Sequence, residues 1–258
     1  MTKIFAVSGV VVKELYRRKD FYVLFILTAL VTLLFGSVNL FKGEGVIRYI
    51  KDICLLLIWV ASLVIAIGTT ARQLPMEKES RTLFPLLAKP LARWELVVGK
   101  FVGCWLACGL ALFCFYLFFG LISASREHAW PLLSYLQAVS LHWVLLAVVI
   151  AMTLLGSLVF TAASSNATIQ FIITAAILLL GQHLNKVAIG LPEPTSSLLY
   201  GIYFIIPHLE FFDIRSLIVH NWPTIPWLTW LAAILYGAAY SAIFLVAACL
   251  IFRKKSLN

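Results

Sequence analysis

Residues 101–124 read FVGCWLACGLALFCFYLFFGLISA, a run of 24 residues without a single Asp, Glu, Lys or Arg. The hydrocarbon core of a bilayer is about 30 Å thick, and a helix needs roughly 20 mostly apolar residues to cross it. Lipid offers no hydrogen-bond partners, so the backbone of such a run must satisfy its own N–H and C=O groups. The run is therefore predicted to be a transmembrane helix.

Five further stretches of the 258-residue chain meet the same test, or nearly so, and they also lack charged residues. They are 21–41, 53–71, 143–163, 167 to about 184, and 227–252. All 31 charged residues lie between or outside the six runs, which chance placement would not produce. The sequence therefore predicts an all-α polytopic membrane protein, a single transmembrane domain (1–258) with six transmembrane helices.

The distribution of Lys and Arg predicts the orientation of these helices. Six spans place both termini on one side, and that side holds 14 Lys and Arg with five acids, against six and six on the other. Because basic loops stay in the cytoplasm, both termini are expected there, in a multi-pass protein of the bacterial inner membrane. We attribute the net charge of +9 to topology and to anionic membrane lipid rather than to nucleic acid.

Two segments outside the spans are expected to lie at the membrane surface. In residues 1–20, Ile4, Val7, Val11 and Leu15 form one apolar helical stripe opposite cations, which is typical of an interfacial helix. The last external segment, 190–226, holds five of the nine prolines and an apolar stretch. It predicts one or two short external helices, interfacial or re-entrant, between spans five and six.

Small residues recur at a spacing of four in the third span and predict close helix packing, within the chain or between chains. They are Gly99, Gly103, Ala107 and Ala111, with a shorter series around Gly237 in the sixth span.

Catalytic motifs are absent from the sequence. It has no Gly-x-x-x-x-Gly-Lys-Ser/Thr loop, no His-Glu-x-x-His and no Gly-x-Ser-x-Gly, so we expect a non-catalytic chain without a cofactor of its own. Two sets of metal-ligand residues leave an alternative open, that of a membrane enzyme or metal-handling protein. Their spacing matches no standard site, and no metal site is predicted. The sets are His208, Glu210, Asp213 and His220 on the outer face, and Cys104 with Cys108 in the third span.

The inner connection 72–100 is longer than a passive connector needs. Pro75 suits a first helical turn, and Pro85 and Pro90 break the chain again, so a cytoplasmic coupling helix is expected between spans two and three. Spans without charged residues cannot carry a coupled ion. The energy for transport should therefore come from outside the membrane, and this loop is where we expect it to act.

The residues of the loop resemble those of type-2 ABC exporter permeases. The shared pattern is Glu, then Arg-Thr-Leu, then Leu-Leu-x-x-Pro-x-x-Arg and a Gly-Lys pair, here within 77–93 and at Gly99-Lys100. Residues 207–213 and the N-terminal Lys-Glu-Leu make the chain most similar to the permeases described as serving multicopper enzyme maturation.

This resemblance implies a permease that pairs with a second permease copy, as a homodimer in the simplest case. Two separate cytoplasmic ATPase subunits would bind ATP and Mg and receive the coupling helix. The residues implied as coupling contacts are Glu77, Arg81, Leu83, Leu86, Leu87, Pro90 and Arg93. Charge-free spans suggest a hydrophobic or lipid-like cargo, or force passed to an external partner protein. A scaffold that recruits cytosolic proteins without transport is a further alternative.

Overall fold

The structure, a computed structural model, describes residues 2–17, 44–79, 92–127 and 131–254, together with five single positions between 22 and 33. Within these ranges all regular structure is helical. The helices are α1 (Thr2–Arg17), α3 (Glu44–Glu79), α5 (Arg93–Glu127), α6 (Leu132–Val159), α7 (Ala163–Ile189), α8 (Thr195–Ile205), the 3-10 helix η1 (Leu209–Phe212), α9 (Arg215–Val219) and α10 (Trp227–Lys254).

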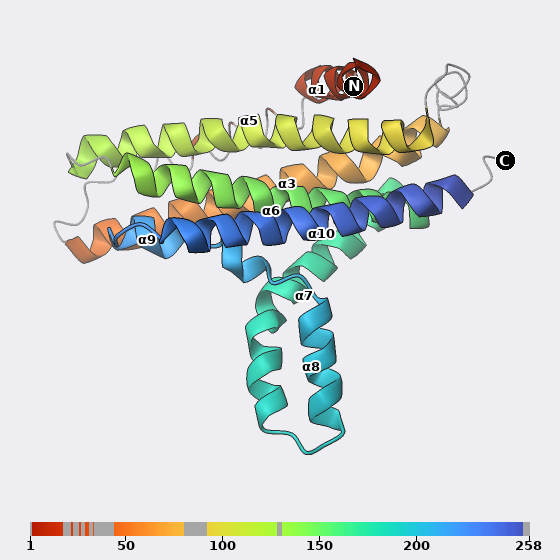
Figure 1. Cartoon of the computed structure of the whole chain (residues 1–258). Coiled ribbons are helices and arrows are strands. Elements are labelled where there is room, and N and C mark those ends of the chain that lie inside the picture. The colour runs from red at the N-terminus through yellow and green to blue at the C-terminus, as the bar shows by residue number, and fades with distance from the viewer. Residues whose placement is uncertain are drawn as a thin grey trace.

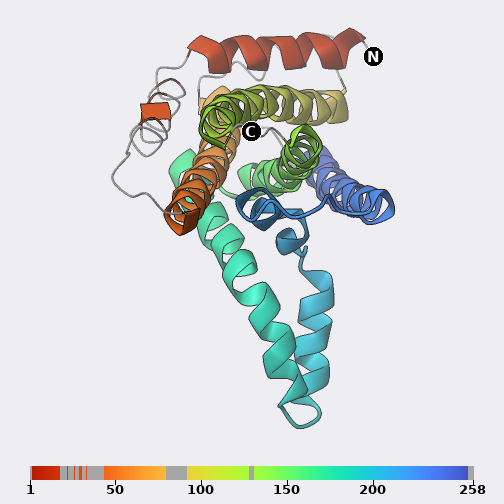
Figure 2. The same cartoon turned by 90° about the vertical axis from the view of Figure 1, so that its left-hand side faces the viewer.

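Four long helices, α3, α5, α6 and α10, run lengthwise side by side and form the body of the protein (Figure 1). Helix α6 is at its centre and packs against the other three. Helix α1 crosses the bundle on one side, over α5, whereas the outer part of α7 and α8 project from the opposite side (Figure 2). We call residues 179–205, the projecting pair of helices with their connection, the arm.

Five helices in the described part of the chain are long and apolar enough to cross a membrane: α3, α5, α6, α7 and α10. They correspond to the second to sixth predicted spans, and the all-α membrane fold is confirmed. The first predicted span, 21–41, lies almost wholly outside the described residues.

The predicted bounds of the fourth span, 143–163, are wrong at both ends, because α6 begins eleven residues earlier at Leu132 and ends at Val159. The extra turns contain Gln137, which both donates to and accepts from the backbone of Ile225, at 3.0 Å each. A hydropathy pattern penalises such a side chain, although its hydrogen bonds remove the cost of burying it.

The expectation that Pro75 starts a new helix is also wrong. Helix α3 continues through Pro75 to Glu79 and thus extends the second span directly into the inner loop. A proline inside a helix removes one hydrogen bond to the fourth preceding residue. Here it occurs one turn before the end of a 36-residue helix, where the rest of the ladder is intact.

The external segment confirms the prediction of short helices, here α8, η1 and α9. Leu209, Phe212 and Ile218 are fully or almost fully buried, so η1 and α9 enter the bundle rather than lie on it. Phe212 packs against α10 at Gly237, where a Cβ atom would come within 2.9 Å of the Phe212 ring. The second half of the segment therefore contributes to the core of the bundle.

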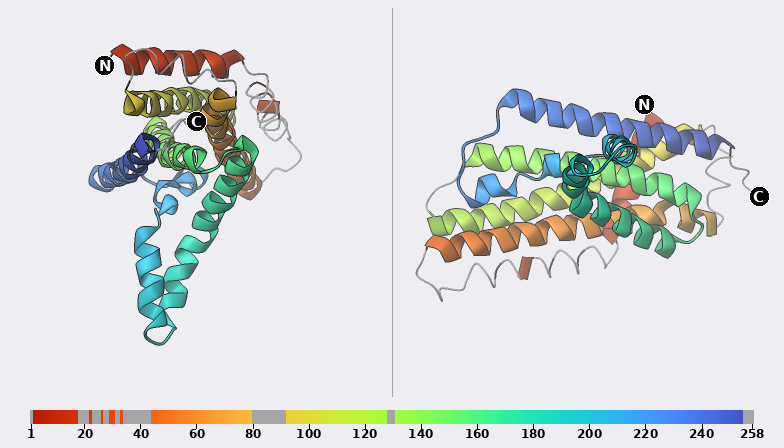
Figure 3. Two further views of the ribbon diagram at one scale, coloured as in Figure 1. Left: turned by 90° about the vertical axis from the view of Figure 1, so that its right-hand side faces the viewer. Right: turned by 90° about the horizontal axis from the view of Figure 1, so that it is seen from below.

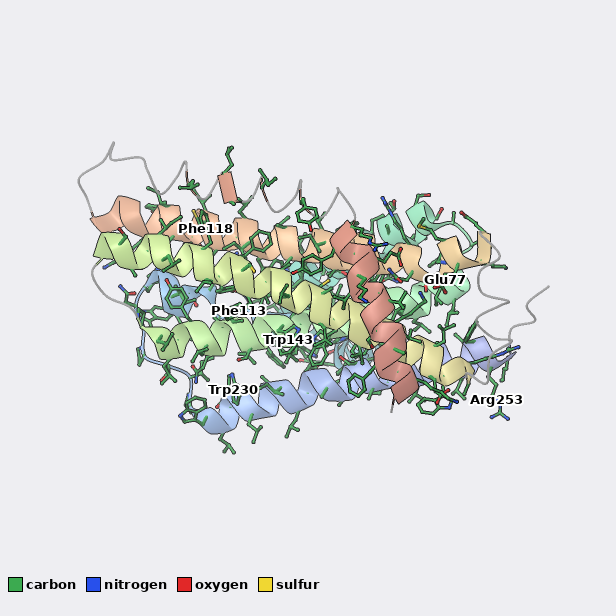
Figure 4. All side chains as sticks on the ribbon, turned by 90° about the horizontal axis from the view of Figure 1, so that it is seen from above. Glu77, Phe113, Phe118, Trp143, Trp230 and Arg253 are labelled. Carbon is green, nitrogen blue, oxygen red and sulfur yellow. The ribbon has the colours of Figure 1, made fainter. Side chains whose placement is uncertain are left out.

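Helices α5 and α6 are joined by two tryptophans that exchange hydrogen bonds. Trp105 Nε1 donates to the Trp143 carbonyl at 2.9 Å, and Trp143 Nε1 donates to the Trp105 carbonyl at 3.1 Å. Their rings stack with centroids 4.5 Å apart; Trp143 is labelled in Figure 4. Neither indole N–H is left without a partner in the lipid-facing bundle.

Helix α1 lies on the small-residue face of α5. A Cβ atom at Gly99 would fall 2.8 Å from Val7 Cβ, and one at Gly103 would fall 2.7 Å from Val11 Cβ and 3.0 Å from the Ser8 carbonyl. Ser8 Oγ also donates to the Gly99 carbonyl at 3.0 Å. The partner of this part of the glycine series is thus α1 of the same chain.

Replacing Gly103 by Ala is expected to lower stability by about 1–3 kcal/mol, because the α1 backbone must move to admit the methyl group. Gly68→Ala is the matched control, since no described residue lies within 4 Å of a Cβ added at Gly68 of α3. Thermal unfolding in detergent measures both. An equal effect of the two variants would contradict the close contact with α1.

Candidate functional site: the helix ends that carry the inner loop

The inner loop is held by the last turns of α3 and the first turns of α5. Of the seven residues implied as coupling contacts, only Glu77 and Arg93 are described. The other five lie outside the described residues and stay predictions: Arg81, Leu83, Leu86, Leu87 and Pro90. The described part of the site therefore consists of the two helix ends, one on each side of the loop.

An ion pair between a buried lysine and a partly buried glutamate joins these two ends. Lys100 of α5 is 2% exposed, and its Nζ lies 2.6 Å from Glu77 Oε1 and 3.0 Å from Gln73 Oε1. Gln73 and Glu77 are four residues apart on α3, so they present both acceptors from one helix face. We call Gln73, Glu77 and Lys100 the inner clamp; Glu77 is labelled in Figure 4.

The inner clamp makes the separation of α3 from α5 unfavourable. A charge buried away from water is costly unless it is paired, so moving α3 off Lys100 would leave an ammonium group without its carboxylate. The sequence placed Lys100 in the loop and did not predict its burial. The spacing of four between Gln73 and Glu77 indicates a polar helix face. It does not identify the helix or the cation that packs against that face.

Arg93 ties the other side of the loop to the last helix. One of its terminal nitrogens donates to the carbonyls of Phe252 and Arg253, at 2.8 and 3.1 Å. Its guanidinium also lies 5.7 Å from the centre of the Phe252 ring. The last carbonyls of a helix lack internal partners and carry partial negative charge, which a cation satisfies. Arg93 thus caps the C-terminal end of α10, which is marked by the label of Arg253 in Figure 4.

The start of α5 is itself capped. Glu95 Oε2 accepts a hydrogen bond at 2.8 Å from the backbone N–H of Ala92, the residue before the helix. A glutamate three residues into a helix that reaches back to the preceding N–H is half of a capping box. Because α5 begins at a defined residue, the positions of Arg93 at its start and of Lys100 two turns later are fixed.

Glu77 and Arg93 therefore bind within the chain. This geometry favours a role in holding the loop rather than in contacting an ATPase directly, for which the undescribed part of the loop stays the candidate. Ala107 and Ala111, further along α5, are buried in the bundle. With Gly99 and Gly103 under α1, the small-residue face of this part of α5 is covered by neighbouring helices.

A second polar group lies where α7 packs on α6. Asn166 and Gln170 of α7 both approach Gly156, and a Cβ there would fall 2.6 Å from Gln170 Nε2 and still nearer to Asn166 Oδ1. Asn166 Nδ2 donates to the Thr153 carbonyl at 3.2 Å. Asn166 Oδ1 and Gln170 Oε1 are buried without a hydrogen-bond partner in the described part of the chain. These amides are uncharged, as the sequence predicted for the spans.

The third polar group lies deep in the bundle. His142 is buried inside α6, about 15 Å from the helix start at 1.5 Å per residue. Ser62 Oγ lies 2.7 Å from its Nε2, and the Tyr116 hydroxyl lies 3.3 Å from its Nδ1. One histidine thus joins α3, α5 and α6.

The outer acids and histidines do not form a metal site. No group of three or more His, Cys, Asp or Glu side chains gathers anywhere in the described ranges. His208 is within 2.9 Å of the Tyr236 hydroxyl, Glu210 lies against Gly181, and His220 stacks on Trp222. The proposed set is therefore dispersed among separate partners. Cys104 and Cys108 are buried, and both are free thiols.

Asp213, the fourth of these residues, pairs with Arg215 through two hydrogen bonds of 2.8 and 2.7 Å. Burial alone would lower the pKa of the Arg215 guanidinium, but the bonds and charge of Asp213 outweigh it and hold that pKa above its usual value. Arg215 also lies over the Trp59 ring, 5.3 Å from its centre. The pair fixes α9 to α3.

A protein-family model described as "ABC-2 family transporter protein" matches residues 28–257, nearly the whole chain. The chain belongs to the ABC-2 transporter family. No curated protein matches it. Membership of the ABC-2 family confirms the resemblance to type-2 ABC permeases and identifies the chain as a multi-pass membrane permease subunit of an ABC exporter. Nothing favours the membrane-enzyme, metal-handling or scaffold alternatives.

Lys100→Met is expected to destabilise the protein by about 1–3 kcal/mol, because it removes the ammonium group that pairs with the partly buried carboxylate of Glu77. Lys78→Met, at an exposed position of the same α3 turn, should change stability by no more than about 0.5 kcal/mol. Unfolding in detergent measures both. Adding Glu77→Gln to Lys100→Met should cost less than the sum of the two single changes, and strict additivity would contradict the inner clamp.

Two buried glutamines offer a matched comparison of hydrogen-bonded and unbonded amides. Gln137→Leu should cost about 1–3 kcal/mol or more, because it strands the N–H and C=O of Ile225. Gln170→Leu should be neutral or slightly stabilising, since Gln170 Oε1 has no hydrogen-bond partner among the described residues. The same unfolding measurement ranks them, and the reverse order would contradict the geometry of both sites.

Proposed function

We propose that this ABC-2 permease is driven by separate cytoplasmic ATPase subunits that bind ATP and Mg and dock on its inner loop. The observation that carries this proposal is the inner clamp. A loop that served only as a connector would not need a fully buried lysine between the two helices that flank it. Movement imposed on the loop is passed to α3 and α5 together.

The tie between Arg93 and α10 extends the same path to the last helix. Loop residues 80–91 are bounded by Glu79, where α3 ends, and by Ala92, which α5 follows. A push on the loop therefore acts on three of the long helices, α3 and α5 directly and α10 through the Arg93 hydrogen bonds. Because α6 packs against all three, a change in their spacing reaches the centre of the bundle.

The orientation follows from the charges. We propose that the loop and both termini are cytoplasmic and that the membrane is a bacterial inner membrane, since 14 of the 20 Lys and Arg residues lie on that side. A second permease copy completes the transporter, in the simplest case an identical one. The likeness of 207–213 to permeases that serve multicopper enzyme maturation supports work done for an external partner protein.

Lys100→Met is expected to separate assembly from coupling. Co-expressed with its ABC ATPase, the variant should still co-purify with it, because the loop surface is unchanged. In nanodiscs, the wild-type permease should stimulate ATP hydrolysis by its ATPase. With Lys100→Met this stimulation should be lost, so that the rate of ATP hydrolysis falls about tenfold, towards that of the isolated ATPase. Lys13→Met, an exposed cation of α1, is the control and should behave as wild type.

Arg81→Ala tests the docking surface separately and should reduce co-purification. Failure of the wild-type chain to bind any ABC ATPase would overturn the proposal. A Lys100→Met variant that stays fully coupled would overturn the clamp as the route of transmission. Assembly with an ATPase without any dependence of a substrate's location on ATP hydrolysis would instead favour a scaffold.

A further inference from the structure

The first half of α7 is polar on its buried side and mainly apolar on its exposed side. Between Ala163 and Ala176, the buried residues are Asn166, Gln170 and Thr174, each at most 3% exposed, whereas all the others are exposed or partly exposed. The three buried residues are four positions apart, so they lie above one another on one helix face. We call them the α7 stripe.

The α7 stripe faces the body of the protein. The first part of α7 lies against α3 and α6 before the helix continues into the arm (Figure 3). Asn166 Nδ2 donates to the Thr153 carbonyl of α6 at 3.2 Å, and a Cβ atom at Gly156 would come within 2.6 Å of Gln170 Nε2. The stripe is therefore packed against neighbouring helices and does not face lipid.

One oxygen atom of each stripe residue lacks a hydrogen bond in the described part of the chain. Asn166 Oδ1, Gln170 Oε1 and Thr174 Oγ1 are all buried, so water does not reach them in this packing. Gln137 is the opposite case, since both of its amide atoms bond to Ile225. A buried acceptor without a partner raises the free energy of the packed state. Apolar side chains of similar size would hold α7 against the body without that cost.

We propose that α7 moves away from α6 and α3, and that water then enters between these helices and hydrates the α7 stripe. All three unpaired atoms are oxygens, which accept hydrogen bonds from water. The connection between α6 and α7 consists of residues 160–162 and keeps their adjoining ends together, so α7 pivots there. The packing in this structure is the closed arrangement of that movement.

A cysteine at position 170 tests whether water reaches the α7 stripe. Gln170→Cys is made in a chain whose five native cysteines are replaced by alanine, and open membrane fragments are treated with a water-soluble methanethiosulfonate reagent. The reagent reacts with the thiolate, and a thiol buried in apolar surroundings stays protonated. Modification should be at least about tenfold faster than in Ala248→Cys, an equally buried position of α10. Equal rates, or no modification at position 170, would overturn the proposal.

Thr174→Val tests the unpaired oxygen itself. The change keeps the shape of the side chain and removes the oxygen, so it favours the closed packing and should slow modification at position 170 about tenfold. Thr153→Val is the matched control, since the Thr153 hydroxyl is equally buried but donates to the Val149 carbonyl at 2.7 Å. It should leave the rate unchanged.

Thr174→Ser separates the hydroxyl from the packing of the side chain. It keeps the unpaired oxygen and should therefore not slow modification at position 170. No slowing by Thr174→Val, or equal slowing by Thr174→Val and Thr153→Val, would contradict the opening of α7.

These measurements use the permease without an ATPase, so the opening of α7 and the proposed function fail separately. Fast modification at position 170 in a chain that binds no ATPase would count against the proposed function alone. A chain that binds its ATPase but is not modified would count against the opening alone.

Discussion

The absence of water inside the bilayer is the constraint on which this structure depends. Most buried polar groups must find their partners within the protein, since unsatisfied groups cost several kcal/mol in hydrocarbon. The bundle meets this demand at a few positions that join separate helices: Lys100 between α3 and α5, His142 among three helices, and the Trp105–Trp143 pair between α5 and α6. Apolar packing fills the space between them. These polar contacts set the register of the helices.

The fold could be largely predicted from the sequence because charge-free apolar runs have one common solution in lipid. The sixth predicted span, 227–252, differs from α10 by two residues at one end. Errors arose where a polar side chain lies inside a helix, as Gln137 does in α6, or where a helix continues beyond the hydrocarbon, as α3 does past Pro75. Hydropathy measures the transfer of single residues and contains no information on their hydrogen-bond partners.

The candidate site could be predicted only in part, for the same reason. The loop motif identified Glu77 and Arg93 as important residues, but their partners lie 23 and about 160 positions away in the chain. In the sequence, Lys100 resembles an ordinary cation that sets the orientation of a membrane helix. Its burial becomes evident only from the position of α3 beside it. In the opposite direction, the outer set of His208, Glu210, Asp213 and His220 looked like a constellation in the sequence, and tertiary structure distributes its members among separate contacts.

The hydrogen bonds of Arg93 to the end of α10 have a practical consequence for spectroscopy. Through these bonds, the start of α5 moves together with the last turn of α10. A fluorophore or spin label placed just after Lys254 would therefore follow the tilt of α5. The conformational cycle of the transporter becomes observable in real time without a label on the surface that its partner must bind.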